Sequence, residues 1–225
     1  MDCPVKYEVE GVSIVLLGSF NPVIFQPAWF VLNKILPNYD VLEPEVNIIH
    51  NQITQFRLDW LKVDVTQDRF FSSTSETANY TTLRDFVVST FAILEHTPIT
   101  KLGVNKDIHY RAENEETWNK IGDILAPKDI WQETLREPGL TSLKIQTPRD
   151  DDLPGRINVH LAPSAQVTPH GVFMGVNHHI ELDELAKDDE QAVEQLAAIL
   201  ENNWDALLQS ADRIIETTIT KAIQC

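Results

Sequence analysis

The 225-residue chain has few cysteines, few glycines and few basic side chains, and each shortage excludes a class of protein. Two cysteines, Cys3 and Cys225, cannot form the set of bridges that holds a small secreted domain together. Eight glycines include no glycine-rich phosphate loop. No run of about 18 apolar residues occurs, and the N-terminus is not a secretory signal. We therefore expect a cytoplasmic protein with reduced thiols and no membrane association.

Basic residues are outnumbered by acidic ones, eighteen against thirty-four, which gives a net charge of −16. Such a charge repels phosphate backbones, so we expect no direct binding to nucleic acid. Residues 181–225 contain eleven acidic and three basic residues. This concentration is typical of a solvated helix face. It is also compatible with a surface that attracts a basic partner, or with a mimic of the charge of DNA.

The first half of the chain alternates strand-like and helix-like segments. Residues 7–17 predict a strand, and Pro27 begins a short helix that ends at Pro37. Three strands are expected within residues 45–75, with Phe56, Leu58 and Trp60 alternating on one face and Gln67-Asp68 forming a tight turn. An apolar stripe then predicts an amphipathic helix, carried by Leu83, Phe86, Val87, Thr90, Phe91 and Leu94.

The second half follows the same order, with a strand at 99–110, two short helices and three more strands. The short helices are expected to turn five residues inward, namely Trp118, Ile121, Leu125, Ile130 and Trp131. The chain closes with a helix from about Asp188 to Gln224, which would either bend near Asn202-Asn203 or project past the sheet.

These patterns predict an α+β fold with antiparallel sheet strands and amphipathic helices on one face, ending in the long C-terminal helix. We expect residues 1–225 to form a single domain. Its halves, 1–97 and 98–225, can both be written β-α-βββ-α, so a pseudo-repeat is an open alternative to a plain α+β order.

Catalytic and metal-binding motifs are not found in the sequence. It has no Gly-x-Ser-x-Gly, and no cysteine lies in a motif that looks buried. Four histidines fall between His160 and His179, but the adjacent His178 and His179 point to opposite faces of a strand and make a shared metal site difficult. Asp150, Asp151 and Asp152 are interpreted as turn residues. We predict no catalytic residue, no metal and no cofactor.

Two sets of residues are candidates for binding. A sheet held by a long helix leaves room for a ligand between the two, and Trp60, His109, Met174 and His178 are the residues expected to line such a pocket. The acidic face of the last helix is the other candidate surface, and its partner-binding residues would be Glu194, Glu201, Asp205 and Asp212.

Several positions of the first 110 residues form a set, namely Phe25, Pro27, Trp60, Leu83, Phe91 and the run Leu102-Gly103-Val104-Asn105. In this set the chain resembles an uncharacterised bacterial family that occurs sporadically, near mobile-element and defence genes. An aromatic-and-arginine pair that would be expected around that glycine is not present. The resemblance implies no catalytic residues.

Three functions follow from the sequence as hypotheses. The first is a non-enzymatic protein-interaction subunit of a cytoplasmic complex, in a bacterial defence or mobile-element system, that binds a protein partner or forms a homo-oligomer. The second is a small-molecule-binding protein or enzyme with a cavity between sheet and helix. The third is an acidic mimic of DNA.

Overall fold

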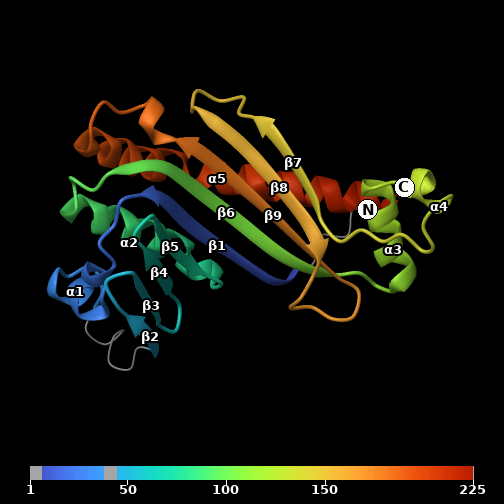
Figure 1. The fold of residues 1–225 in the computed structure, drawn as a ribbon, viewed down its shortest axis with the longest axis horizontal. Coiled ribbons are helices and arrows are strands. Elements are labelled where there is room, and N and C mark those ends of the chain that lie inside the picture. Colours follow the sequence, from blue (N-terminus) through green and yellow to red (C-terminus); the bar gives the residue numbers. More distant parts are fainter. Residues whose placement is uncertain (1–6, 38–44, 225) are drawn as a thin grey trace.

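The computed structural model describes residues 7–37 and 45–224, and the side chains of 45–47 are not part of that description. Both cysteines, Cys3 and Cys225, lie outside the described residues. Nine strands form one antiparallel sheet in the order β2-β3-β4-β5-β1-β6-β9-β8-β7 (Figure 1). The strands are β1 (Tyr7–Gly18), β2 (Glu45–Ile49), β3 (Ile53–Arg57), β4 (Lys62–Thr66), β5 (Arg69–Thr74), β6 (Ile99–Arg111), β7 (Leu143–Pro148), β8 (Gly155–Pro163) and β9 (Gly171–Glu181).

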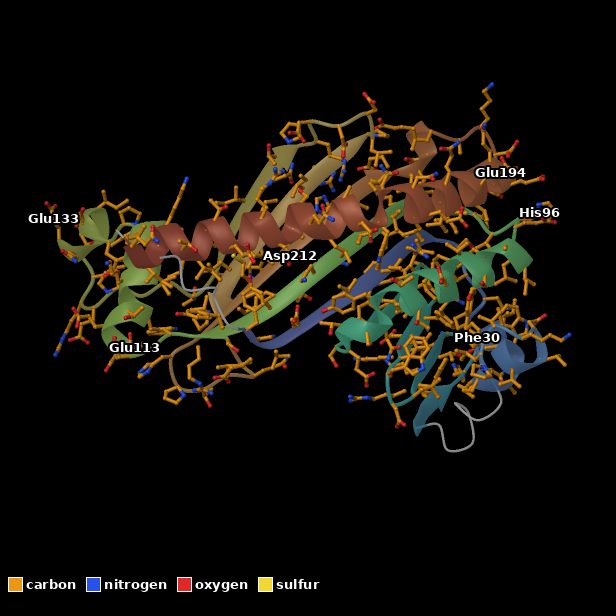
Figure 2. All side chains as sticks on the ribbon, turned by 180° about the vertical axis from the view of Figure 1, so that it is seen from behind. Phe30, His96, Glu113, Glu133, Glu194 and Asp212 are labelled. Atoms are coloured by element: carbon orange, nitrogen blue, oxygen red, sulfur yellow. The ribbon has the colours of Figure 1, made fainter. Side chains whose placement is uncertain are left out.

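Five α-helices accompany the sheet: α1 (Pro27–Leu32), α2 (Tyr80–Ile93), α3 (Glu115–Leu125), α4 (Asp129–Gln132) and α5 (Asp189–Gln224). Short 3-10 helices occupy Pro22–Ile24, Thr77–Asn79 and Leu182–Glu184. Seen from behind, α2 and α5 both lie across the same face of the sheet (Figure 2). The fold is therefore α+β with an antiparallel sheet and a long C-terminal helix, as the sequence predicts.

The strand order is symmetric about the central pair, β1 and β6. Outward from β1 lie β5, β4, β3 and β2, and outward from β6 lie β9, β8 and β7. Each half runs strand, helix, meander, helix, so the second half follows the predicted β-α-βββ-α order with its first helix split into α3 and α4. The first half contains one strand more.

That extra strand arises because the chain turns between Leu58 and Leu61, where the sequence pattern predicts a continuous strand. The segment expected to be one continuous strand with Trp60 on its face is a hairpin, because the amide of Leu58 donates to the carbonyl of Leu61 at 2.8 Å. Residues 45–74 therefore form four strands instead of three. The expected tight turn at Gln67-Asp68 is confirmed between β4 and β5.

The core lies between the helices and the sheet and consists of two hydrophobic clusters. One gathers α1, α2 and the first part of α5 around Phe25, Phe30 and Phe70. The other joins the last part of α5 to β6 and β9 through Ile108 and Met174.

Helix α5 is continuous from Asp189 to Gln224, so no break occurs at Asn202-Asn203. Its buried positions run from Ala192 to Ala222, which shows that it stays on the sheet and its neighbours along almost its whole length. The predicted inward side of the short helices is wrong for two residues, because Ile130 is 77% and Trp131 50% exposed. Among the described residues, no helix is both long and apolar enough to cross a bilayer.

Candidate functional site: the open face of the sheet

Side chains alternate between the two faces of each strand, and only one face carries packed helices. On the central strands the even-numbered residues, such as Leu102 and Val104 of β6 and Val176 of β9, are buried against the helices. The odd-numbered residues point to the opposite face, which is turned toward the viewer in Figure 1. We call this surface the open face.

A row of paired polar residues crosses the open face from β3 to β7. Strand by strand, the register pairs them as Arg57, Lys62, Ser73, Ser13, Asn105, Asn177, Asn158 and Gln146. Since neighbouring strands lie about 4.8 Å apart, the row spans roughly 30 Å. We refer to it as the polar row.

Hydrogen bonds join the middle of the polar row into a chain. The amide nitrogen of Asn158 donates to the side-chain oxygen of Asn177 at 2.9 Å, and Asn177 donates to that of Asn105 at 2.7 Å. Asn105 in turn donates to the hydroxyl of Ser13 at 3.1 Å. All three amides point their donors in the same direction, so the side chains are fixed in orientation across four strands.

Two glycines leave the space that these polar groups occupy. A Cβ at Gly103 would lie 2.9 Å from the side-chain nitrogen of Asn177, and a Cβ at Gly175 would lie 2.5 Å from a carboxyl oxygen of Asp107. Both polar side chains therefore lie flat over a neighbouring strand at positions where any larger residue would displace them.

A cavity of about 370 Å³ opens on this face beside the polar row. Its floor is formed by Gly11 and Ser13, and its walls come from the β3–β4 turn on one side and from the β8–β9 loop on the other. Its lining combines aromatic, basic, acidic and amide groups: Trp60, Phe71, Phe173, Arg57, Lys62, Glu10, Asp59, Asp107, His109 and Gln166.

Asp107 carries the one carboxyl group that β6 contributes to this cavity. Burial raises its pKa to about 6. No hydrogen bond or ion pair of its side chain is found within the described residues, and its cross-strand neighbours are Gly11 and Gly175. A desolvated carboxyl without a partner in a cavity marks a candidate binding or acid–base group.

His109, two residues along the same strand, is held by Ser164. The ring Nδ1 and the Ser164 hydroxyl are 2.7 Å apart, and that hydroxyl also accepts from the amides of Gln166 and Val167. The hydroxyl proton is therefore directed to Nδ1, which leaves Nε2–H as the donor of the neutral ring. Desolvation lowers the pKa of His109, so the ring is neutral at pH 7.

The other end of the open face is an ion cluster around Glu181. Its carboxylate accepts from Lys101, from Arg156 at 3.1 Å and from Nε2 of His179 at 3.0 Å. The hydrogen bond from Lys101 is the main cause that lowers the pKa of Glu181. Lys101 and Arg156 are both paired with Glu181, so they are less available to a ligand than the basic residues beside the cavity, for which no ion pair is found among the described side chains.

The open face is basic although the protein is acidic. Within the described residues it carries seven basic side chains, namely Arg57, Lys62, Arg69, Lys101, Arg111, Lys144 and Arg156. Four carboxylates on the strands accompany them, namely Glu8, Asp64, Asp107 and Glu181, and Asp59 of the β3–β4 turn adds a fifth beside the cavity. In a chain of net charge −16, this face is locally positive and the acidic excess lies elsewhere.

The four predicted pocket residues are divided between the two faces. Trp60 and His109 both line the cavity on the open face. Met174, with 0% exposure, and His178, with 2%, point to the helix face and belong to the packed interior. The structure thus brings together two of the four, on the face opposite to the expected one, because hydrophobic side chains fill the space between α5 and the sheet.

His178 has a separate environment under the β7–β8 hairpin. Its Nδ1 accepts from Arg149 at 3.3 Å, and Arg149 forms a two-point ion pair with Asp151. Burial is the main cause that lowers the pKa of His178 to about 4. Asp151, interpreted from the sequence as a turn residue, thus fixes a buried arginine.

The four predicted partner-binding acids are also not equivalent. Glu194, Glu201 and Asp205 are exposed on α5, whereas Asp212 forms an ion pair of 2.7 Å with Lys106. Figure 2 shows Asp212 in the middle of α5, over the sheet, and Glu194 near the beginning of the helix. Lys106 is buried, so Asp212 anchors α5 to β6 while the other three face solvent.

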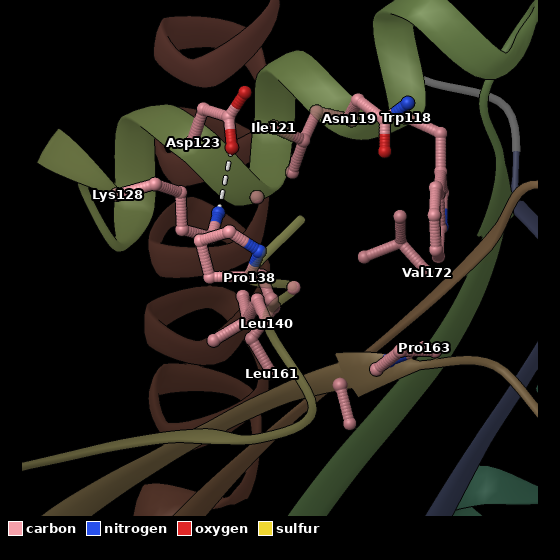
Figure 3. Close-up of a pocket in the computed structure, with 13 residues that line it drawn as sticks. Trp118, Asn119, Ile121, Asp123, Lys128, Pro138, Leu140, Leu161, Pro163 and Val172 are labelled. Carbon is pink, nitrogen blue, oxygen red and sulfur yellow. Dashed lines mark hydrogen bonds and ion pairs between the residues drawn. The ribbon is translucent and has the colours of Figure 1, made fainter. Parts of the chain in front are cut away.

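A smaller cavity of about 80 Å³ lies beside α3 (Figure 3). Lys128 closes it and donates to Asp123 at 2.6 Å. Trp118, Ile121 and Leu161 make the space mostly apolar. It is too small for most organic ligands.

The sequence patterns named Asn105 only within the run Leu102–Asn105, and they did not point to Asp107, Asn158 or Asn177. Their signal is present, because asparagine, aspartate and glycine are depleted in strands and yet recur in β6 and β9. No group of three or more metal-ligating side chains occurs in the part of the chain that the structure describes.

Comparison of the chain with models of known protein families gives no match. None of the curated proteins matches the sequence either.

Proposed function

We propose that the protein is a non-enzymatic binding subunit of a cytoplasmic complex and that the open face of its sheet is the binding surface. The observation that carries the proposal is the polar row, a hydrogen-bonded array across four strands on a face without helices. The three asparagines of the row are half-buried, and strand positions favour β-branched and aromatic residues instead. A run of asparagines that breaks this preference is typical of a functional surface. The resemblance to a bacterial family near defence and mobile-element genes suggests that the complex belongs to a defence or mobile-element system.

A pull-down with two matched variants tests the proposal. One variant, Lys62→Glu with Lys144→Glu, reverses two exposed charges of the open face, on β4 and on β7, at either side of the central strands. The other, Glu201→Lys with Asp205→Lys, reverses two exposed charges on α5. We expect the first to lose the partner captured from source cells and the second to keep it, as measured by mass spectrometry and light scattering.

Loss of the partner only in the α5 variant would contradict the proposal and favour the acidic helix as the binding surface. A monomer that captures nothing would contradict the subunit function itself. Circular dichroism of both variants serves as the control for folding.

The cavity supports a second candidate, a small-molecule-binding protein. Its volume of about 370 Å³ lies within the range of ligand sites, and Asp107 and His109 supply two groups able to exchange protons. For DNA mimicry the support is weaker, because Lys106 neutralises one of the four acids considered, Asp212.

A further inference from the structure

The cavity on the open face joins three kinds of chemistry. Its lining includes the basic residues Arg57 and Lys62 and the aromatic rings of Trp60, Phe71 and Phe173. It also includes three carboxyl groups, of which Glu10 is paired with Lys106, Asp59 is exposed and Asp107 is desolvated. A ligand that uses all three must have an anionic part, a flat part and a part that donates hydrogen bonds.

The volume of the cavity further restricts which ligands could fill it. Organic ligands occupy sites of about 300–1,000 Å³, and this cavity measures about 370 Å³. A single ion or a small free amino acid would leave most of the space empty. A mononucleotide has the three required parts and fills a space of this order.

The basic pair is suited to a phosphate. Arg57 and Lys62 face each other across β3 and β4, and no carboxylate forms an ion pair with either among the described side chains. Lys62 and Arg69 lie over the ring of Phe71 at 5.8 and 4.8 Å, which fixes Lys62 near the cavity. Two adjacent cations repel each other, and a bound phosphate would relieve that repulsion.

Asp107 is suited to one base above the others. An ionised carboxylate accepts hydrogen bonds with two oxygens and donates none. Guanine presents two adjacent donors on its Watson–Crick edge, N1–H and the exocyclic amine, whereas adenine, cytosine and uracil each present a donor next to an acceptor. Flat aromatic walls stabilise any base by stacking, so the carboxylate would supply the discrimination.

We propose that this cavity binds a guanine nucleotide, with the base edge on Asp107 and the phosphate on Arg57 and Lys62. The proposal rests on the proposed function in taking the open face as the binding surface. The overall charge of −16 does not oppose it, because charges beyond about 8–10 Å are largely screened at physiological salt. Near the cavity, the phosphate would lie beside Arg57 and Lys62, away from the desolvated Asp107.

Isothermal titration of the purified full chain with GMP, GTP and AMP tests the proposal. We expect GMP and GTP to bind at least about tenfold tighter than AMP. Asp107→Asn, which replaces one acceptor by a donor, should abolish that preference. Lys62→Ala should weaken all three nucleotides about tenfold, whereas Lys187→Ala, an exposed lysine beside α5, should change nothing.

A five-residue RNA with one central guanosine distinguishes free nucleotide from nucleotide within a strand. Binding of the oligonucleotide with the same dependence on Asp107, and no binding of GMP, would support the site and identify its source as single-stranded RNA. Absence of binding to all of these ligands at about 1 mM would overturn the proposal. So would equal binding of GMP and AMP.

The titration uses the isolated protein, so its result does not depend on the pull-down. A nucleotide can bind while no partner is captured, and a partner can be lost from the open-face variant while no nucleotide binds. Urea unfolding of Asp107→Asn and Lys62→Ala separates lost binding from lost folding.

Discussion

Two polar side chains at the centre of β6 and β9 lie over glycines of the neighbouring strand, where no side chain competes for the space. Asn177 lies against Gly103, and Asp107 lies against Gly175. The side-chain amide of Asn177 donates one hydrogen bond and accepts another along the polar row. The carboxyl group of Asp107 makes none among the described residues, and this difference separates a structural residue from a candidate binding residue.

Asp107→Asn is expected to stabilise the protein at neutral pH. Burial raises the pKa of this carboxyl to about 6, so ionisation is less favourable in the folded chain than in the unfolded one. The folded state binds more protons between about pH 4 and 6, and stability falls as the pH rises through that interval. The variant removes the penalty, and we expect a gain of roughly 2–3 kcal/mol at pH 8 and little gain at pH 4.

Urea denaturation of both proteins at the two pH values measures this difference. Asp59→Asn, at an exposed residue of the β3–β4 turn, is the control and should change stability by less than about 0.5 kcal/mol. An equal gain from Asp107→Asn at pH 4 and pH 8 would show that the carboxyl is not desolvated.

At the scale of elements, the attachment of α5 depends on one buried lysine. Lys106 lies 2.7 Å from Asp212 of α5 and 3.4 Å from Glu10 of β1, and its ammonium group is 5.5 Å from the ring centre of Tyr80 in α2. Four elements thus meet at a single charge. The acid on α5 is part of this contact, which is why the acidic side of the helix is not uniformly available to a partner.

Asp212→Ala is expected to destabilise the protein by roughly 1–3 kcal/mol, because it leaves a buried ammonium group with only the longer contact to Glu10. The effect is below that of a fully buried pair, since the Asp212 side chain is 36% exposed. Asp205→Ala, at an exposed position of the same helix, should change stability by less than about 0.5 kcal/mol. Thermal unfolding of the two variants measures both, and equal effects would contradict the anchoring role.

At the scale of the whole molecule, the sheet has a protected centre and a weak edge. β6 pairs with β1 on one side and β9 on the other, whereas β7 pairs only with β8 and its residues are mostly exposed. Local opening requires less free energy where few buried contacts are lost. The β7 end of the polar row therefore opens more readily than its middle.

Hydrogen exchange should show this difference directly. We expect the amides of Val104 and Lys106 in β6 to exchange at least about 100-fold more slowly than the paired amides of β7. Exchange followed by mass spectrometry of peptides resolves the two strands. Equal protection in β6 and β7 would mean that the sheet opens only as a unit.

The periodicity of the sequence determined the elements themselves. Alternation predicted β1, β6 and β9, and the apolar stripes predicted α2 and α5, because these patterns depend on neighbours a few residues apart. The acidic character of the last helix and the opposite directions of His178 and His179 also follow from local order.

Only the tertiary structure decided which face of each strand the helices cover. Alternation shows that neighbouring residues of one strand point to opposite faces of the sheet. It does not show whether His109 and Met174, on two strands far apart in the chain, point to the same face. The pairing register of β6 and β9 decides this, and it places Met174 under α5 and His109 in the cavity with Asp107. The polar row likewise needs eight strands in one order, and strand order is set by packing of the whole sheet and by no local pattern.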